Sequence, residues 1–140
     1  MNVNIKKYRY LIMKRTLLEN HEVKIELEDG IVIANWKTSF VDINVARRAV
    51  QYRLESTNHV PYPLLSNIKS IKNGTKEARD FLALESSCEG IIAAAVLINS
   101  PIGSMIGNFF ISINKPFVTT KIFTDETEAK KWLTQFVKKE

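Results

Sequence analysis

One stretch near the N-terminus decides the fold class, and it reads Val23-Lys24-Ile25-Glu26-Leu27-Glu28-Asp29-Gly30-Ile31-Val32-Ile33-Ala34-Asn35-Trp36. Residues 23–28 alternate apolar and charged side chains with period two, which is typical of a half-buried strand. Asp29-Gly30 supplies the positive φ angles that a tight turn needs, and residues 31–36 form a second run that can return beside the first. We predict a β-hairpin here, and the remaining elements extend from it.

Downstream of the hairpin, helical and strand patterns take turns. Helices are predicted from Asp42 to about Ser56, from Thr75 to the glycine at position 90, over 101–114, and after Asp125; strands are predicted over 64–68, 91–98 and 118–123. The resulting order is β-β-α-β-α-β-α-β-α. An antiparallel hairpin followed by three βα units predicts an α/β fold with a mixed sheet, with right-handed crossovers placing helices against it.

Length and composition fit one folded domain. The chain has 140 residues, of which 45% are hydrophobic and 25% charged, the balance of a soluble globular protein. The longest apolar run, residues 91–98, is too short to cross a bilayer, so we expect no integral membrane segment. The single cysteine, Cys88, excludes an intramolecular disulfide and has no basic neighbour in the sequence, which favours an inert thiol. The expected location is cytoplasmic.

The positive charge is concentrated at the N-terminus. Residues 1–20 carry a net charge of +4 out of the total of +5, so the rest of the chain is nearly neutral. We therefore expect residues 1–20 to be a basic arm, either disordered or an added start, and residues 21–140 to be one domain. Met13 is an alternative start that would make residues 1–12 dispensable. A nucleic-acid partner is not expected, because such proteins carry a basic stripe on the folded domain itself.

The sequence contains no recognisable catalytic or metal-binding constellation. His21 and His59 fall outside the predicted strands and helices and do not form a metal-ligand spacing with a cysteine or carboxylate, so surface histidines are the expectation. Phosphate-binding glycine loops and the nucleophile motif of hydrolases do not occur. We therefore expect no metal, no cofactor and no enzymatic activity. The alternative of an enzyme requires carboxylates such as Asp80 or Glu85 to be brought together by folding.

Several motifs together resemble a known family. They are Leu27-Glu28-Asp29-Gly30-Ile31, Thr75-Lys76-Glu77-Ala78-Arg79-Asp80-Phe81, Gly107-Asn108-Phe109-Phe110, Asn114-Lys115-Pro116 and Phe123-Thr124-Asp125-Glu126 followed by Ala129, Trp132 and Leu133. In this order they resemble the STAS-like fold of sulfate transporters and anti-sigma factor antagonists. The similarity is greatest to an uncharacterised bacterial branch that is grouped with STAS and the CRAL-TRIO lipid-binding proteins.

The resemblance implies a regulatory turn before the second helix. In anti-sigma factor antagonists a phosphorylatable serine lies in this turn, and the corresponding candidate residues here are Lys72, Asn73, Gly74, Thr75 and Lys76. The usual aspartate and serine are missing, so Thr75 offers the hydroxyl, and Ser70 does so less plausibly. A phosphoryl group on Thr75 would be stabilised by the helix N-terminus and nearby lysines. The simpler interpretation, which we favour, is that Thr75 only caps the helix.

The predicted helix over 101–114 carries a wide apolar stripe with two glycines four residues apart. The candidate interaction or pocket residues on it are Ile102, Gly103, Ile106, Gly107, Phe109 and Phe110. The glycines allow another backbone to approach closely, as in a homodimer contact or the wall of an apolar pocket. Packing on the domain's own sheet is the simpler interpretation.

Two functions follow from these observations. The first is a non-enzymatic regulatory module that binds a protein partner or a second copy of itself. The second, suggested by the CRAL-TRIO resemblance, is a carrier of a small apolar or lipid-like ligand in a pocket under helix 101–114. The small size of the chain favours the first, because a complete core and a large pocket compete for the same residues.

Overall fold

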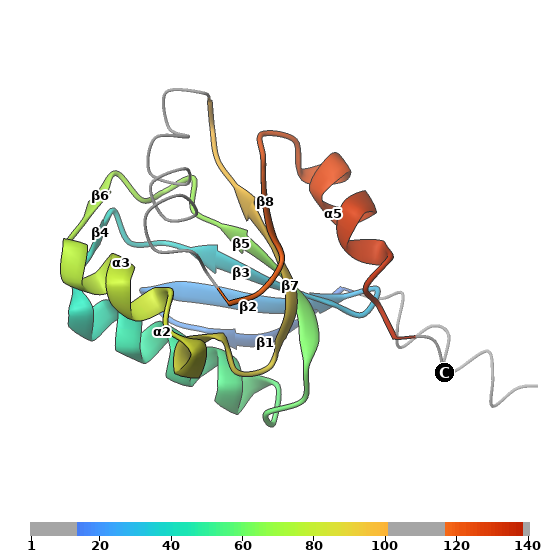
Figure 1. The fold of residues 1–140 in the computed structure, drawn as a ribbon, viewed down its shortest axis with the longest axis horizontal. Helices are drawn as coiled ribbons and strands as arrows, with labels where there is room; N and C mark the ends of the chain where they lie inside the picture. The colour runs from blue at the N-terminus through green and yellow to red at the C-terminus, as the bar shows by residue number, and fades with distance from the viewer. Residues whose placement is uncertain (1–13, 101–116, 139–140) are drawn as a thin grey trace, which may run out of the picture.

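The computed structural model describes residues 14–100 and 117–138, and a six-stranded sheet forms its centre (Figure 1). In chain order the strands of this sheet are β1 (Arg15–Glu19), β2 (Val23–Glu28), β3 (Ile31–Trp36), β5 (Tyr62–Asn67), β7 (Ile91–Leu97) and β8 (Thr120–Phe123). They lie side by side in that same order. β1, β2 and β3 pair antiparallel, whereas β3, β5, β7 and β8 pair in parallel. The predicted mixed sheet is confirmed.

Helices cover both faces of the sheet. The described helices are α2 (Ile43–Ser56), α3 (Lys76–Leu82), the 3-10 helix η1 (Glu85–Cys88) and α5 (Glu126–Thr134). α2 and α3 lie on one face, and α5 lies on the opposite face (Figure 1). Two short strands, β4 (Phe40–Val41) and β6 (Asn73–Gly74), pair in parallel beside the helices on the α2 side and lie outside the main sheet.

The hairpin that the sequence predicted is present. Asp29 and Gly30 have φ angles of 53° and 78°, which is the backbone of a tight two-residue turn, and Glu28 pairs with Ile31 across it. The alternation along β2 sends Val23, Ile25 and Leu27 into the core on the α2 side, and all three are buried.

The α5 side of the sheet is tightly packed. Its core consists of buried side chains from β3, β5, β7 and α5, namely Ile31, Ile33, Leu65, Ala93, Ala95, Leu97, Ala129 and Leu133. Trp132 completes it by packing against Phe123 and Phe136, with ring centroids 5.7 and 5.0 Å away. Ala129, Trp132 and Leu133, which belong to one of the motifs quoted above, thus lie on the face of α5 that packs on the sheet.

The residues at which the sequence predicted these three helices to begin act as their N-terminal caps. Asp42, Thr75 and Asp125 each accept a hydrogen bond from the backbone N–H three residues later, at 2.9, 3.1 and 3.2 Å. These bonds satisfy N–H groups that the helix itself leaves unpaired, so α2, α3 and α5 begin where the sequence indicated.

The prediction of an arm over residues 1–20 is wrong for residues 15–19, which form the edge strand β1. Its register on β2 shifts between Thr16 and Leu18, so this strand lacks the period-two pattern by which strands are found in a sequence. Leu17 and Leu18 nevertheless pack against the core on the α2 side. The folded domain therefore begins before residue 21.

Three other boundaries differ from the prediction. β5 starts at Tyr62 rather than 64, and the buried Pro63 lies inside it, where the pairing with β7 shifts register. Proline has no N–H to give to the ladder, so an irregularity there is expected. α3 ends at Leu82, and the chain continues through η1 to Gly90, whose φ is 77°. β8 starts at Thr120 rather than 118.

Candidate ligand-binding site

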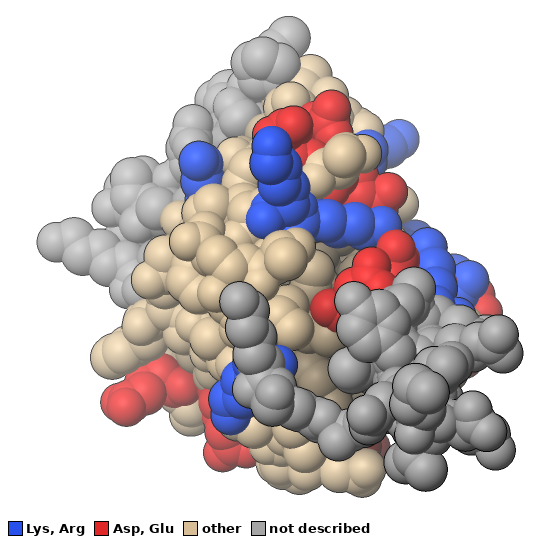
Figure 2. Space-filling model, turned by 90° about the vertical axis from the view of Figure 1, so that its right-hand side faces the viewer, with Lys and Arg blue, Asp and Glu red and all other residues tan. Residues whose placement is uncertain are grey.

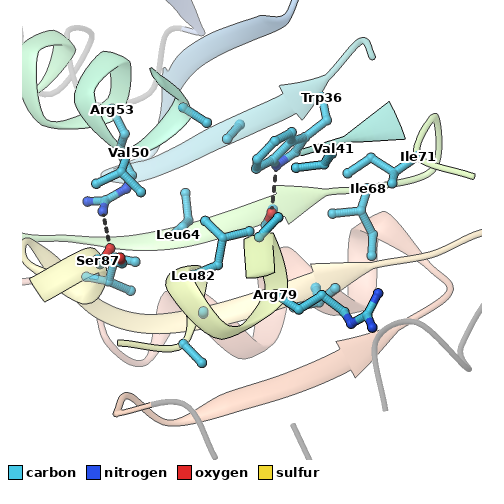
Figure 3. A pocket seen from close by; sticks show the side chains of 18 of the residues that line it. Trp36, Val41, Val50, Arg53, Leu64, Ile68, Ile71, Arg79, Leu82 and Ser87 are labelled. Atoms are coloured by element: carbon cyan, nitrogen blue, oxygen red, sulfur yellow. Dashed lines mark hydrogen bonds between the residues drawn. The ribbon is translucent and has the colours of Figure 1, made fainter. Parts of the chain in front are cut away.

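A cavity of about 370 Å³ lies between the sheet and the helices α2 and α3 (Figure 3). Small-molecule sites in proteins usually measure about 300–1,000 Å³, so this volume is at the lower end of that range. Most of its described wall is apolar, with contributions from the sheet and from both helices, including Ile25, Leu64, Val96, Val50 and Leu82.

The cavity exists because small side chains face each other across it. On the sheet these are Ala34, which pairs directly with Ser66 on the neighbouring strand, and Ala94 on β7. Ala78 and Ala83 face them from α3 and its C-terminal cap. Where larger side chains would interdigitate, these residues leave space, in contrast to the packed α5 side.

Trp36 and Ser66 form a polar pair in the wall. The indole Nε1 of Trp36 donates a hydrogen bond to the Ser66 Oγ at 3.1 Å (Figure 3). The serine hydroxyl keeps its own hydrogen and a further lone pair. It can therefore donate to or accept from a group placed in the cavity.

Arg53 occupies the wall at a distance from this pair, in the last turn of α2, and only 7% of the residue is exposed. Its Nη1 donates to the Glu89 carbonyl oxygen at 2.7 Å and its Nη2 to the Ser87 carbonyl oxygen at 2.8 Å. Burial lowers the pKa of the Arg53 guanidinium from its ordinary value, although Cys88 and Glu89 partly oppose this. Among the ion pairs of residues 14–100 and 117–138, none includes Arg53.

The candidate turn over 72–76 lies at the rim of the cavity. Asn73 and Gly74 contribute to its wall, whereas Lys72 is exposed and donates its backbone N–H to the Ser39 carbonyl oxygen at 2.8 Å. The backbone of Gly74 also accepts a bond from Arg79 Nη1 at 2.7 Å. The structure therefore joins this turn to the cavity, which sequence analysis did not foresee.

Within the turn, the two candidate side chains already have intramolecular partners. The Thr75 hydroxyl accepts the capping bond from the Ala78 N–H at 3.1 Å, and the Lys76 Nζ lies 2.7 Å from Asp80 Oδ2. The capping interpretation of Thr75 matches this geometry. A phosphoryl group at this position would have to displace the capping bond and compete for Lys76 with Asp80.

Cys88 also faces the cavity and is buried. Burial raises the pKa of its thiol, with smaller opposing effects from the Phe117 backbone and Arg53. A thiol with a raised pKa holds little thiolate near neutral pH, which agrees with the predicted inert cysteine.

The candidate pocket residues on the predicted helix over 101–114 are Ile102, Gly103, Ile106, Gly107, Phe109 and Phe110, and they lie outside the described residues. A pocket under that helix therefore stays a prediction. The described wall of the cavity includes residues of α2, α3, η1 and the sheet. Sequence analysis did not assign Arg53 to a site. A signal was present, since Arg53 falls on the same helix face as Ala46 and Val50, where a charged residue is unusual.

The histidine prediction needs one correction. Folding brings Glu89 to His59, with 3.0 Å between Nδ1 and Oε2, although the two residues are 30 positions apart in the sequence. Both side chains are more than half exposed, and they lie on the surface. No group of three or more potential metal ligands occurs within residues 14–100 and 117–138.

A second ion pair, outside the cavity, fixes α2 to the turn between β1 and β2. Arg48 Nε and Nη2 donate to the two carboxylate oxygens of the buried Glu22, each at 2.8 Å. The hydrogen bond from Arg48 is the main reason that the pKa of Glu22 lies below its ordinary value, against the opposing effect of burial.

Charges of both signs are interspersed on the face that carries α5 and the hairpin turn (Figure 2). The Nζ atom of Lys130 lies 3.4 Å from Glu28 Oε2 and 3.9 Å from Glu126 Oε2, so this lysine forms ion pairs with both carboxylates. In the described part of the chain, no helix has both the length and the apolar character needed to span a bilayer.

Comparison with known proteins identifies the fold and the family. The solved structures include an uncharacterised protein of the DUF3478 family from Shewanella loihica PV-4, which has a SpoIIAA-like, and therefore STAS-like, fold. It matches this chain with a TM-score of 0.54 and 14% sequence identity. The match covers 83% of this chain and 97% of that one. No curated protein matches. The STAS-like fold that the sequence motifs indicated is thereby confirmed. Residues 25–137 match the family described as a domain of unknown function, DUF7793, and the chain belongs to this family.

Proposed function

We propose that this protein is a non-enzymatic binding module that holds a small apolar ligand in the cavity between the sheet and helices α2 and α3. The observation that carries this proposal is the cavity itself, about 370 Å³ in volume with a mainly apolar wall. A STAS-like fold fits a regulatory binding module. The cavity favours the carrier function, which sequence analysis ranked second because the chain is small.

The proposed site has the composition of a small-molecule pocket. Apolar side chains supply most of the contact area, which favours an apolar ligand through the removal of surface from water. A few polar groups, including the Trp36–Ser66 pair, can orient that ligand.

The position of the 72–76 turn supports a regulatory role for the ligand. Asn73 and Gly74 contribute to the wall, and Lys72 on the same turn is exposed. A ligand in the cavity would contact the backbone on one side of the turn, while a protein partner could contact the other side. We therefore propose that occupancy of the cavity changes how this turn presents itself to a partner.

A neutral fluorescent probe tests the binding site directly. N-phenyl-1-naphthylamine becomes bright when it enters an apolar pocket, and we expect saturable binding of one molecule per chain. Ala94→Leu fills the cavity from the sheet and should abolish the signal. Gln51→Leu is the matched control, because it adds the same side chain to the exposed surface of α2. Equal binding by wild type and Ala94→Leu would remove the cavity as the site.

Hydrogen exchange tests the regulatory part. With the probe bound, the amides of residues 72–76 should exchange more slowly, because the ligand restrains the wall that they form. If exchange slows only in β5 and β7, the probe binds without affecting the turn, and the regulatory part of the proposal is wrong. The phosphorylation hypothesis has its own test: Thr75→Ala should abolish modulation of partner binding, and unchanged modulation would contradict it.

The other expected properties stay predictions. A homodimer and a protein partner are compatible with a STAS-like fold. The cytoplasmic location and the lack of a nucleic-acid partner follow from the sequence patterns given above. Sedimentation of the full chain with and without DNA would test the oligomeric state and the nucleic-acid prediction together.

A further inference from the structure

The position of one charged side chain indicates the chemistry of the ligand. Arg53 contributes to the cavity wall, and only 7% of the residue is exposed to solvent. Burying a guanidinium is unfavourable unless its charge and its donors are met by partners. The partners that the structure gives it are two neutral carbonyl oxygens, those of Ser87 and Glu89.

The charge of Arg53 is therefore poorly compensated within the described chain. The backbone carbonyl of Glu89 is one of these partners, but its side-chain carboxylate lies at the surface and pairs with His59 at 3.0 Å. The ion pairs of the described residues do not include Arg53. Burial lowers the pKa of this guanidinium, against smaller opposing effects of Cys88 and Glu89.

The guanidinium also has donors to spare. An arginine side chain carries five N–H bonds in a planar fork, and the two carbonyl oxygens take one from Nη1 and one from Nη2. These two bonds fix the plane of the fork, and Figure 3 shows the one to Ser87. A guanidinium held in this way is preorganised to receive a carboxylate, because less side-chain entropy is lost when the ligand binds.

Apolar wall surrounds this cation. Val50 lies one helical turn before Arg53, and Leu64 and Ile91 face the cavity from β5 and β7. A ligand that places an anionic group on Arg53 would thus have its remaining atoms among apolar side chains, with the Trp36–Ser66 pair farther along the wall (Figure 3). A buried cation in a mainly apolar cavity matches an amphipathic acid.

We propose that the ligand of the cavity is a small apolar carboxylic acid, bound through its carboxylate to Arg53. This inference rests on the proposed function and adds the head group. The alternative role of Arg53 is purely structural, since its two bonds to Ser87 and Glu89 hold η1 against α2. A structural role alone predicts no preference for an anionic ligand, so ligand chemistry separates the two.

A series of ligands with one chain length tests the head group on the unmodified full-length protein. Decanoic acid, decanol and decylamine compete with bound N-phenyl-1-naphthylamine at neutral pH, where decanoate is ionised. We expect decanoate to bind about tenfold or more tightly than decanol, the effect of one charge-assisted hydrogen-bonded pair, and decylamine to bind most weakly. Equal affinities for decanoate and decanol would overturn the head-group assignment while leaving the cavity proposal intact. Failure of all three and of the probe to bind would contradict the proposed function itself.

Variants then locate the anion. Arg53→Met keeps a long unbranched chain in the wall and should lose the preference for decanoate while still binding decanol. Arg79→Met is the matched control, because Arg79 is another arginine of the cavity wall and lies on α3. Loss of the preference in Arg79→Met alone would assign the carboxylate to Arg79 and overturn our assignment. If Arg53→Met does not fold, Arg53→Lys keeps a charge, and the ligand series on the wild type still decides the head group.

Discussion

The most direct consequence of the cavity is that two adjacent alanines should respond oppositely to the same substitution. Ala94 and Ala95 are neighbours on β7 and point to opposite faces of the sheet. Ala94 is 8% exposed and faces the cavity, whereas Ala95 is fully buried in the packed core under α5. Leucine at position 94 would fill space that is empty, and leucine at position 95 would need space that is occupied.

The magnitudes follow from burial. Leucine adds about three carbon atoms to alanine, worth about 2.4 kcal/mol of transfer free energy at roughly 0.8 kcal/mol each. Loss of rotamer freedom removes roughly 0.5–1 kcal/mol of that. Ala94→Leu should therefore raise the free energy of unfolding by about 1.5 kcal/mol. At position 95 overpacking should lower it by about 1–3 kcal/mol.

Urea unfolding of the ligand-free proteins, monitored by tryptophan fluorescence, measures both effects. With a slope of roughly 1–3 kcal/mol per molar, Ala94→Leu should move the midpoint upward by on the order of 1 M, and Ala95→Leu should move it downward by a similar amount. Equal slopes are required, because a change of slope would indicate an altered denatured state rather than a packing effect. Destabilisation by both substitutions would refute the reasoning, since it would mean that no space adjoins Ala94.

Other predictions concern the turn, an ion pair and a cap. Gly30→Ala should destabilise by about 1–3 kcal/mol in thermal unfolding, because φ is +78° and the new Cβ would lie 2.7 Å from Val137 Cγ1; trimming Val137 to alanine as well should relieve only the steric part. The pKa of Glu22 is lowered in the folded protein, so its ionised carboxylate stabilises the fold at pH values above its unfolded pKa. This stabilisation is lost as the pH falls through the folded pKa. On acidification the urea midpoint of the wild type should therefore fall more than that of Glu22→Gln. Thr75→Ala should cost about 1 kcal/mol of unfolding free energy by loss of the cap, whereas Thr75→Ser should keep most of it, and an equal loss in both would contradict the capping role.

Features governed by neighbouring residues could be predicted from the sequence. The turn at Asp29-Gly30 and the caps at Asp42, Thr75 and Asp125 depend on a few adjacent side chains, and each lies where the pattern placed it. The mixed sheet could be predicted because the order of strands and helices restricts the sheets that can form, whereas the STAS-like fold was indicated by the resemblance of several motifs to that family.

Features that depend on distant parts of the chain could not be predicted. β1 is a strand because β2 lies beside it, and its irregular register conceals it in the sequence. The cavity likewise depends on which small residues meet across the sheet, as Ala34 and Ser66 do on adjacent strands. Arg53 showed only that a charge falls on a buried helix face; its carbonyl partners are 34 and 36 residues away in the sequence.

The cavity also has a cost that bears on its function. Where the space excludes water, its walls lose the contacts that a filling side chain would make, at a cost of roughly 24 cal/mol per Å³ of empty volume. Larger side chains at Ala34, Ala78 or Ala94 would reduce that loss. A ligand specific for the folded state restores stability by another route, about 2.7 kcal/mol at a concentration one hundred times its Kd. A wall lined by alanines therefore lowers the stability least in a protein that folds around a bound molecule. The ligand-free chain should be the less stable form.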